Sequence, residues 1–305
     1  MHAQIIFACF GEGMKERNEE NKGKKVLFLS GKGGAGKTSL AVATFLYLLR
    51  KGKKVHLFDC DVECPNAGLF IKNKRFLEEE AVIINLAKIN KDKCINCGKC
   101  MSVCMFGSIM PSKSGHYKVI EESCKGCFAC SLICPNNAIE KIEEKIGVIK
   151  TFFVKEKPFP SFFVEGSLIP GKEDSMPIID GMLKKAKAVG DYDYLIIDAE
   201  AGIKCPVLKL IENADVIFLV AEYSSFGILD ALRALKAIEE LDKTCYLVIN
   251  KFKDNLKLDL SVFENKRSIL RMYKVNFEKD FLKRYGKGEI SLDFSEKMPF
   301  LEVFP

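Results

Sequence analysis

The apolar residues of this chain gather in short, unbroken runs, with helical patterns between several of them. Continuous runs of this kind are typical of strands that are buried on both faces of a parallel sheet. Strand alternating with helix predicts an α/β fold in which right-handed crossovers place helices against a mostly parallel sheet. Five runs are predicted to be strands of this sheet: Val26–Leu29, Val55–Phe58, Leu195–Ile197, Val216–Val220 and Tyr246–Ile249.

Two helices and one more strand follow from the same patterns. Ser39–Arg50 is almost wholly apolar and is followed by Gly52, which predicts a buried helix with a glycine beyond its C-terminus. A short strand is predicted at Phe162–Val164. A second helix is predicted to pack on the sheet through residues that recur at helical spacing, namely Ile228, Leu232, Leu235 and Ile238.

The alternation breaks between residues 89 and 146, where an internal repeat of cysteines takes its place. Both halves follow the spacing C-x2-C-x2-C-x3-C. Fewer than sixty residues build only a small core, so metal binding would supply much of this segment's folding free energy. We interpret residues 89–146 as a small α+β domain inserted into a larger α/β domain, which is formed by residues 24–88 and 147–305.

This cysteine spacing resembles that of bacterial two-cluster ferredoxins, and Pro135 follows the last cysteine as it does there. In those proteins the fourth cysteine of each run ligates the other cluster. The resemblance implies one [4Fe–4S] cluster on Cys94, Cys97, Cys100 and Cys134, and a second on Cys124, Cys127, Cys130 and Cys104. Met105 replaces the proline expected after the first run. The alternative is a pair of structural zinc sites, whose motifs usually space their ligand pairs further apart.

A glycine-rich loop connects the first predicted strand to the first predicted helix, with the P-loop sequence G-x4-G-K-T. Its backbone N–H groups would point at nucleotide phosphates. Lys37 would reach the β- and γ-phosphates, and the Thr38 hydroxyl would coordinate Mg²⁺. The residues expected around the nucleotide are Gly31, Lys32, Gly33, Gly34, Ala35, Gly36, Lys37, Thr38 and Ser39.

A second lysine in this loop, Lys32, makes the chain resemble the deviant Walker-A ATPases: MinD, ParA, the Mrp-type cluster carriers and nitrogenase iron protein. In that family this lysine reaches the nucleotide of a partner subunit, which implies an ATP-dependent homodimer. The segment that begins Asp59-Cys60-Asp61 resembles the family's switch I. Asp61 would orient the attacking water, and Asp59 would lie near the Mg²⁺ shell.

The family's remaining nucleotide elements have counterparts as well. Leu195-Ile196-Ile197-Asp198 resembles Walker B, with Asp198 holding Mg²⁺ through water. Asn250, at the end of a predicted strand, is similar to the element that reads adenine. The chain is most similar to MinD-superfamily ATPases that contain an inserted ferredoxin domain, over residues 24 to 250. ATP is therefore the expected nucleotide.

Two segments depart from that family pattern. Ala199-Glu200-Ala201 replaces the proline-containing segment expected in the family's second switch, switch II, and resembles the Glu-Ala-Gly of carbon monoxide dehydrogenase maturation ATPases. Residues 274–277 are only loosely similar to the family's Ile-Pro-Phe-Asp. Cys205 follows the second switch segment by a few residues and is singled out among the five remaining cysteines, which are otherwise expected to be mostly buried hydrophobes.

Composition limits the cellular setting. Thirteen cysteines without an export signal favour metal ligation in a reducing cytoplasm over disulfides. No apolar run reaches the length of a membrane-spanning helix. Abundant Lys and Glu with scarce Arg resemble a hyperthermophile protein. The first residues have no evident place in the fold, so residues 1–23 are interpreted as an extension and native translation is expected to begin at Met14.

The positive charge is concentrated near the C-terminus. Residues 251–287 hold eleven Lys or Arg against five Asp or Glu, an excess that equals the net charge of +6 of the whole chain. We interpret this segment as a lysine-rich solvated face, because it lacks an arginine cluster and interleaved aromatic residues. A nucleic-acid or membrane surface is disfavoured, and an acidic protein partner lies between these interpretations.

Three functions are considered for a chain that contains both a nucleotide switch and two runs of cysteines. The first is ATP-gated electron transfer to a redox partner, which a full set of eight ligands favours. The second is the assembly or delivery of metal centres to an apo-metalloprotein, favoured by Glu200. The third is a positioning ATPase similar to MinD or ParA, in which the cysteine-rich insertion has no role.

Overall fold

The computed structural model describes residues 23–113, 115–155, 158–290 and 295–305. The five strands that were predicted from continuous apolar runs are confirmed. The sixth predicted strand, at residues 162–164, lies within β7 (Ser161–Leu168). The other five strands are β1 (Lys24–Ser30), β2 (Val55–Cys60), β8 (Tyr194–Ala201), β9 (Val216–Glu222) and β10 (Cys245–Phe252). The expected start at Met14 lies outside the described residues.

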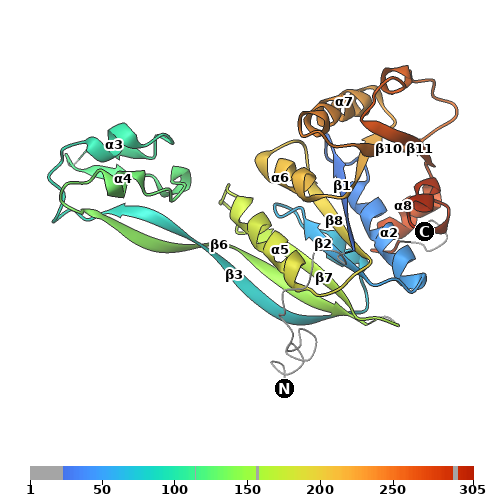
Figure 1. The fold of residues 1–305 in the computed structure, drawn as a ribbon, viewed down its shortest axis with the longest axis horizontal. Coiled ribbons are helices and arrows are strands. Elements are labelled where there is room, and N and C mark those ends of the chain that lie inside the picture. Colours follow the sequence, from blue (N-terminus) through green and yellow to red (C-terminus); the bar gives the residue numbers. More distant parts are fainter. Residues whose placement is uncertain (1–22, 114, 156–157, 291–294) are drawn as a thin grey trace. The chain divides into compact units, whose positions relative to one another are not determined.

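In the described part of the chain these six strands join β11 (Ile269–Asn276), β6 (Ile139–Val154) and β3 (Lys74–Ile89) in one nine-stranded sheet. Its order is β11-β10-β9-β1-β8-β2-β7-β6-β3 (Figure 1). Every neighbouring pair from β11 to β7 is parallel. The strands β11, β3 and β6 were not predicted from the sequence. β3 and β6 escaped prediction because their residues alternate between exposed and half-buried positions over much of their length, without the continuous apolar run of a buried strand.

Helices cover both faces of the parallel part of the sheet. α2 (Lys37–Arg50) connects β1 to β2, whereas α6 (Cys205–Asn213) and α7 (Ser225–Glu240) connect strands that progress in the opposite direction along the sheet. Right-handed crossovers therefore place α2 on one face and α6 and α7 on the other, as Figure 1 shows. α5 (Met176–Ala188) follows β7.

The predicted helices are confirmed in their packing. α2 ends at Arg50, and Gly52 has the left-handed φ of 70° that favours glycine after a helix. In α7 the side chains of Ile228, Leu235 and Ile238 are buried, whereas Leu232 is only half-buried. Small alanines complete the buried face of α7.

An aromatic cluster closes the face of the sheet that holds α2. The rings of Phe28 and Phe218 stack with centroids 4.9 Å apart, and Phe300 contacts both. Phe300 lies in the 3₁₀ helix η5 (Pro299–Val303), and the segment before it contains α8 (Lys279–Tyr285). The C-terminal segment is therefore part of the core of the α/β domain.

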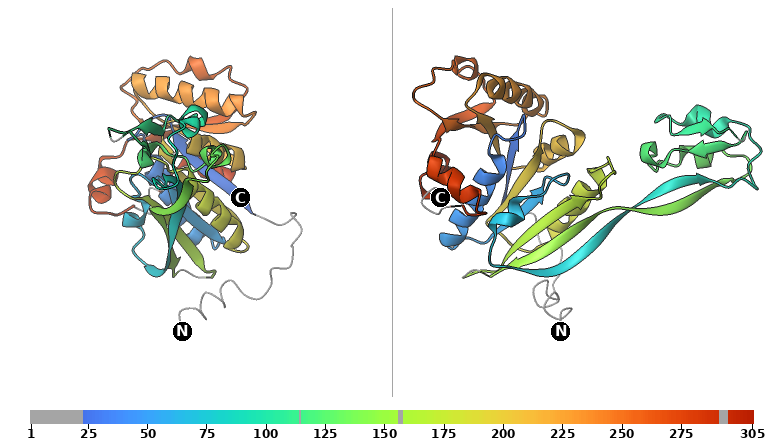
Figure 2. Two further views of the ribbon diagram at one scale, coloured as in Figure 1. Left: turned by 90° about the vertical axis from the view of Figure 1, so that its left-hand side faces the viewer. Right: turned by 180° about the vertical axis from the view of Figure 1, so that it is seen from behind.

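The chain divides into two compact units. The larger contains the residues up to Glu80, then Ile149–Ser167 and Ile178–Pro305, and the smaller contains Ala81–Val148 and Leu168–Pro177. Residues 89–146, which were interpreted as an insertion, lie within the smaller unit. Its bounds are wider because β3 and β6, which run side by side in Figure 2, each continue past the predicted boundaries.

The smaller unit repeats a cysteine-containing turn followed by a short helix. Its helices are α3 (Lys99–Val103) and α4 (Ala129–Leu132), and its strands β4 (Ile109–Pro111) and β5 (Tyr117–Val119) pair antiparallel. A 3₁₀ turn, η3, precedes the second run of cysteines. Its small core consists of Ala87, Ile89, Cys100, Ile109 and Cys130. Among the residues that the structure describes, no helix has the length and apolar character needed to cross a bilayer.

Candidate functional site

The P-loop leads into α2, and two of its glycines adopt the left-handed backbone conformation. Gly34 has φ 79° and Gly36 has φ 93°. A Cβ atom on Gly36 would lie 2.2 Å from Nδ2 of Asn250, so this position has no space for a side chain. Nδ2 of Asn250 in turn donates to the carbonyl of Ala35 at 2.8 Å. The amide that was expected to read adenine therefore also holds the backbone of the P-loop.

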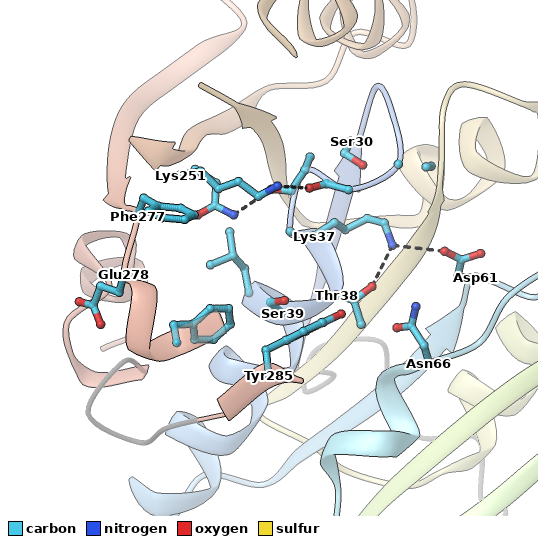
Figure 3. A pocket seen from close by; sticks show the side chains of 18 of the residues that line it. Ser30, Lys37, Thr38, Ser39, Asp61, Asn66, Lys251, Phe277, Glu278 and Tyr285 are labelled. Atoms are coloured by element: carbon cyan, nitrogen blue, oxygen red, sulfur yellow. Dashed lines mark hydrogen bonds and ion pairs between the residues drawn. The ribbon is translucent and has the colours of Figure 1, made fainter. Parts of the chain in front are cut away.

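Lys37 connects the P-loop to the acidic residues of two strands. Its side chain is buried, and Nζ lies 2.6 Å from Oδ1 of Asp198. Nζ also lies 3.5 Å from the Thr38 hydroxyl and 3.8 Å from Oδ2 of Asp61, and Figure 3 shows it pointing between these two groups. Burial alone would lower the pKa of Lys37, but Asp198, together with Asp61 and Asp59, outweighs burial and the pKa is raised. Lys37 therefore stays charged.

Two carboxylates lie opposite each other at the ends of β2 and β8. Asp59 and Asp198 are register partners, and both are fully buried. Asp59 accepts backbone N–H groups from Asp61 at 3.2 Å and from Asn66 and Ala67 at 2.9 Å. Burial and the neighbouring Asp198 raise the pKa of Asp59 to about 8. One oxygen of Asp198, Oδ2, has no partner among the described residues, as expected for a group arranged around a cation.

Lys32, the residue that carries the family resemblance, is paired within its own chain. Its Nζ lies 2.7 Å from Glu222 at the end of β9. Glu222 also pairs with Lys251 at 2.8 Å, and Lys251 donates to the carbonyl of Gly34 at 2.7 Å. Burial would raise the pKa of Glu222, but the two lysines lower it. Sequence reasoning missed Glu222, although it follows an apolar run at the same edge of the sheet.

A cavity of about 290 Å³ extends from the P-loop toward the C-terminal segment. The loop residues from Gly33 to Ser39, Asp61 and Asn250 line it, as Figure 3 shows in part. Gly31, Lys32, Asp59 and Asp198 border the site without lining the cavity. Its far wall was not predicted and consists of Asn276, Phe277, Glu278, Phe281 and Tyr285. Aromatic side chains there provide flat apolar surface of the kind that a nucleobase contacts.

A charged triad joins the segment after β2 to the start of α6. Nζ of Lys204 lies 2.6 Å from Glu63 and 3.5 Å from Glu200. Glu200 is 3% exposed, and its carboxylate oxygens have no hydrogen-bond partner among the described residues. Burial raises the pKa of Glu200, and Lys204 opposes the shift. The glutamate that departs from the family pattern is thus part of a link between the segments that follow Asp59 and Asp198.

The eight cysteines of the smaller unit line two cavities, and each cavity draws on both runs. Three cysteines of one run and the fourth of the other line each cavity. The first cavity is lined by Cys94, Cys97, Cys100 and Cys134. The second is lined by Cys124, Cys127, Cys130 and Cys104.

The backbone around the cysteines follows the internal repeat. Asn96 and Gly126 occupy equivalent positions with φ 56° and 61°, and Gly98 and Phe128 do so with φ 73° and 56°. These left-handed residues turn the chain so that successive cysteines face one cavity. Phe128 adopts this conformation without being glycine, and Lys141 lies 4.8 Å from its ring.

The cysteine sulfurs also accept backbone hydrogen bonds, as thiolates bound to iron do. The N–H of Ser108 donates to Cys104 at 3.3 Å, and the N–H of Ala138 donates to Cys134 at 3.2 Å. Within the described part of the chain, no three His, Cys, Asp or Glu side chains are grouped to hold a single metal ion. In a four-iron cluster each cysteine binds a different iron, and each cavity is lined by the four cysteines that such a cluster needs.

The other described cysteines divide into two classes. Cys60 and Cys245 are buried, and burial raises the pKa of both thiols. Cys64 and Cys205 are exposed; Cys205 was singled out from the sequence, whereas the exposure of Cys64 was not expected. Both exposed cysteines adjoin the triad, because Cys64 follows Glu63 and Cys205 follows Lys204.

Several basic residues between 251 and 287 are committed to ion pairs. Lys251 pairs with Glu222, Arg271 lies 2.6 Å from Glu302, and Lys283 lies 3.4 Å from Asp280. Arg271 and Lys283 are largely exposed. The contacts agree with a solvated basic face, part of which supports the P-loop.

The parallel sheet, the P-loop before α2 and the acidic ends of β2 and β8 define a P-loop NTPase of α/β fold. A family model described as the CobQ/CobB/MinD/ParA nucleotide binding domain matches residues 26–291, and the chain belongs to that family. An uncharacterized protein of Methanocaldococcus jannaschii is 32% identical over 244 residues, which are 79% of this chain and 83% of that protein.

Two further comparisons concern the two parts of the chain. The cell division ATPase MinD of Pyrococcus furiosus has the same fold, with a TM-score of 0.52 and 12% identity over 92% of this chain and 95% of that chain. The pyruvate synthase subunit PorD of Methanocaldococcus jannaschii is 37% identical over 57 residues, which are 19% of this chain and 66% of that subunit. The chain therefore combines a nucleotide-binding domain of the CobQ/CobB/MinD/ParA family with a ferredoxin-like segment.

Proposed function

We propose that this protein uses ATP binding and hydrolysis to gate electron transfer from two [4Fe–4S] clusters to a partner protein. The observation that carries the proposal is the crossed lining of the two cysteine cavities in a chain that also contains a complete P-loop site. Eight thiols divided evenly between two cavities provide full ligation for two clusters. Full ligation suits a resident electron carrier better than a cluster that is handed to another protein.

The nucleotide part of the proposal assigns roles to individual residues. The backbone from Gly33 to Thr38 would bind the phosphates, and Lys37 would neutralise the β- and γ-phosphates. Thr38, with Asp198 and Asp59 behind it, would hold Mg²⁺. Asp61, which lies 3.8 Å from Lys37, would orient the attacking water. Asn250 would fix the P-loop, and the aromatic wall formed by Phe277, Phe281 and Tyr285 would contact the base.

Lys32 connects the nucleotide to a second copy of the chain. It is about one-third exposed and bound to Glu222, so it can leave this partner at modest cost in free energy. We propose that in an ATP-dependent homodimer it contacts the nucleotide of the other subunit. The triad of Glu63, Lys204 and Glu200 would transmit the change, since it joins the two segments that follow Asp59 and Asp198.

When bound, the clusters would supply reversible one-electron storage. The chain provides the eight thiolates, the N–H groups that donate to Cys104 and Cys134, and a small apolar core beside the cysteines. The cysteine content fits a reducing cytoplasm, where we place the protein. Its partner would be a redox protein, and the exposed basic residues suit an acidic partner surface.

The direct test is the rate at which anaerobically reduced protein reduces benzyl viologen with ATP, with ADP and with a non-hydrolysable analogue. The proposal expects a rate that depends on ATP hydrolysis in the wild type and not in Lys37→Ala. A rate that is unaffected by nucleotide in protein that contains about eight irons would contradict the gating.

A second candidate is the assembly or delivery of metal centres to an apo-metalloprotein. Two observations favour it: Glu200 replaces the family's expected segment, and Cys64 and Cys205 are exposed beside the triad. ATP-dependent transfer of iron to an apo-ferredoxin, together with loss of the protein's own cluster signal, would support this function over electron transfer. A positioning function similar to that of MinD leaves the eight cysteines without a role and ranks third.

A further inference from the structure

The internal repeat of the smaller unit relates the two cysteine cavities residue by residue, and one buried position breaks the relation. Ser108 follows Cys104 by four residues, and Ala138 follows Cys134 by four. Ser108 lines the second cavity, and Ala138 lines the first. Both residues are 2% exposed.

The backbone makes the same contact at both positions, so only the side chains differ. The N–H of Ser108 donates to Sγ of Cys104 at 3.3 Å, and the N–H of Ala138 donates to Sγ of Cys134 at 3.2 Å. Ser108 adds a hydroxyl where Ala138 has only a methyl group. Burial would raise the pKa of the neighbouring Cys104 thiol, but backbone N–H groups and the Ser108 hydroxyl lower it. The hydroxyl nevertheless makes no hydrogen bond of good geometry with a described residue.

A buried hydroxyl without a partner is destabilising, because it has lost its bonds to water and gained none. Such a group in a native fold calls for a ligand, an ion or a water molecule that completes it. The Ser108 hydroxyl belongs to the lining of a cavity surrounded by four thiols, and sulfur is a hydrogen-bond acceptor.

We propose that the Ser108 hydroxyl donates a hydrogen bond to a sulfur of the cluster held by Cys104, Cys124, Cys127 and Cys130, and that it raises the reduction potential of that cluster. This inference rests on the proposed function, which places a cluster in each cavity. Reduction adds negative charge to the cluster and its sulfurs. A donor aimed at a sulfur therefore stabilises the reduced form more than the oxidised form.

The lysines that line the two cavities favour reduction of the first cluster rather than the second, but their effect on the potentials is weaker than that of the hydroxyl. Lys99 lines the first cavity, whereas Lys125, which lines the second, is 3.1 Å from Asp174 and partly neutralised. The Lys99 and Lys125 side chains lie at the surface, where water and salt screen their charge. A buried hydroxyl in contact with a sulfur is not screened, so its effect on the potential is the larger of the two.

The consequence is that the two clusters of this chain are not equivalent. The hydroxyl biases a single electron toward the cluster in the second cavity. One added hydrogen bond should shift the distribution of that electron between the two clusters by about tenfold. For a one-electron couple, tenfold corresponds to about 59 mV.

Reciprocal substitutions in the full-length protein test the inference. Ser108→Ala removes the hydroxyl and gives the second cavity the residue of the first, and Ala138→Ser does the reverse. Each of the two residues is already tolerated at the equivalent position of the repeat. Potentials are measured by anaerobic redox titration with electron paramagnetic resonance, and exchangeable protons near the clusters by electron-nuclear double resonance after transfer to D₂O.

We expect Ser108→Ala to lower the reduction potential of the cluster in the second cavity by about 59 mV, which corresponds to the tenfold effect. The variant should also lose one exchangeable proton coupling. Ala138→Ser should raise the other potential. Ser102→Ala is the matched control, because its hydroxyl binds the carbonyl of Lys99 at 2.9 Å and lines neither cavity. If both variants contain two clusters and their potentials and proton couplings are unchanged, this inference is wrong, whereas the proposed function is not affected. Purified protein without iron would overturn the proposed cofactors as well.

Discussion

The ammonium of Lys37 and the carboxylate of Asp198 are 2.6 Å apart in a buried site, although 161 positions separate them in the chain. Lys37 begins α2 and Asp198 lies near the end of β8, so the contact exists only because β8 is the parallel neighbour of β1. The P-loop lysine and the acidic strand ends thereby neutralise each other. A bound phosphate and a cation would each replace one member of this pair.

Lys37→Ala should abolish ATP hydrolysis and also lower the free energy of unfolding. The variant leaves Asp198 buried without its cation, which costs about 3–5 kcal/mol. Adding Asp198→Asn should restore part of the lost stability but no hydrolysis, because the cation ligand is then missing. Phosphate release and urea unfolding measure the two effects. Normal turnover by Lys37→Ala, or a double variant no more stable than the single one, would contradict this assignment.

Gly36→Ala should weaken nucleotide binding strongly. A Cβ atom would lie 2.2 Å from Nδ2 of Asn250, and alanine at φ 93° adds about 1–2 kcal/mol of backbone strain. Asn250→Ala should weaken binding less, since only the hydrogen bond to Ala35 is lost. In the double variant the clash disappears, so the two effects should be less than additive. Titration with a fluorescent ATP analogue completes the cycle, and full additivity would show that the two positions are not coupled.

The stability of the α/β domain should fall as the pH is lowered from 6.5 to 4, because His56 is buried without charge. Burial lowers the pKa of His56 from 6.5 to about 4. Between these values the unfolded chain binds a proton that the folded chain does not, so acid favours unfolding. The full difference is about 3 kcal/mol.

His56→Asn is the variant that checks this pH dependence. The Asn oxygen can accept the N–H of Phe162, which now donates to Nδ1 at 3.2 Å, and it does not titrate. Urea unfolding at pH 6.5 and pH 5 should show a smaller loss of stability in the variant than in the wild type. Equal losses in both proteins would mean that His56 does not titrate in the way its burial requires.

The triad of Lys204, Glu63 and Glu200 should show two couplings of different size. Lys204 and Glu63 are both half-exposed, so their coupling should not exceed about 1 kcal/mol in spite of the 2.6 Å distance. Glu200 is buried, so Lys204→Met should cost more stability with Glu200 present than in Glu200→Gln. Double-mutant cycles by urea unfolding give both couplings. Lys204→Arg, which keeps the charge, is the control, and equal couplings would refute the importance of burial here.

Cys134→Ser should disturb the cluster of the first cysteine run, although Cys134 lies in the second. Cys134 lines the cavity of Cys94, Cys97 and Cys100. The variant should lose or convert one cluster signal in electron paramagnetic resonance and keep the other. Cys104→Ser is the matched control and should affect the opposite cluster. If Cys134→Ser and Cys127→Ser alter the same signal, the ligation is not crossed.

The sequence by itself determined the parts of this protein that depend on local patterns. Continuous apolar runs identified the buried strands, since a strand covered on both faces must be apolar at every position. The P-loop and the cysteine spacing were equally readable, because phosphate and cluster chemistry require fixed residues at fixed short separations. The long strands β3 and β6 were missed, because partly exposed strands need no continuous apolar run.

Only the tertiary structure decided which distant residues meet. The pairs Lys32 with Glu222, Gly36 with Asn250 and Lys37 with Asp198 arise from the order of strands in the sheet, which no single segment encodes. The C-terminal aromatic wall joins the nucleotide cavity for the same reason. Ser108 became informative only when its hydroxyl proved to be buried without a partner. Spacing along a chain fixes which groups are available, whereas packing fixes which of them are left to bind a ligand.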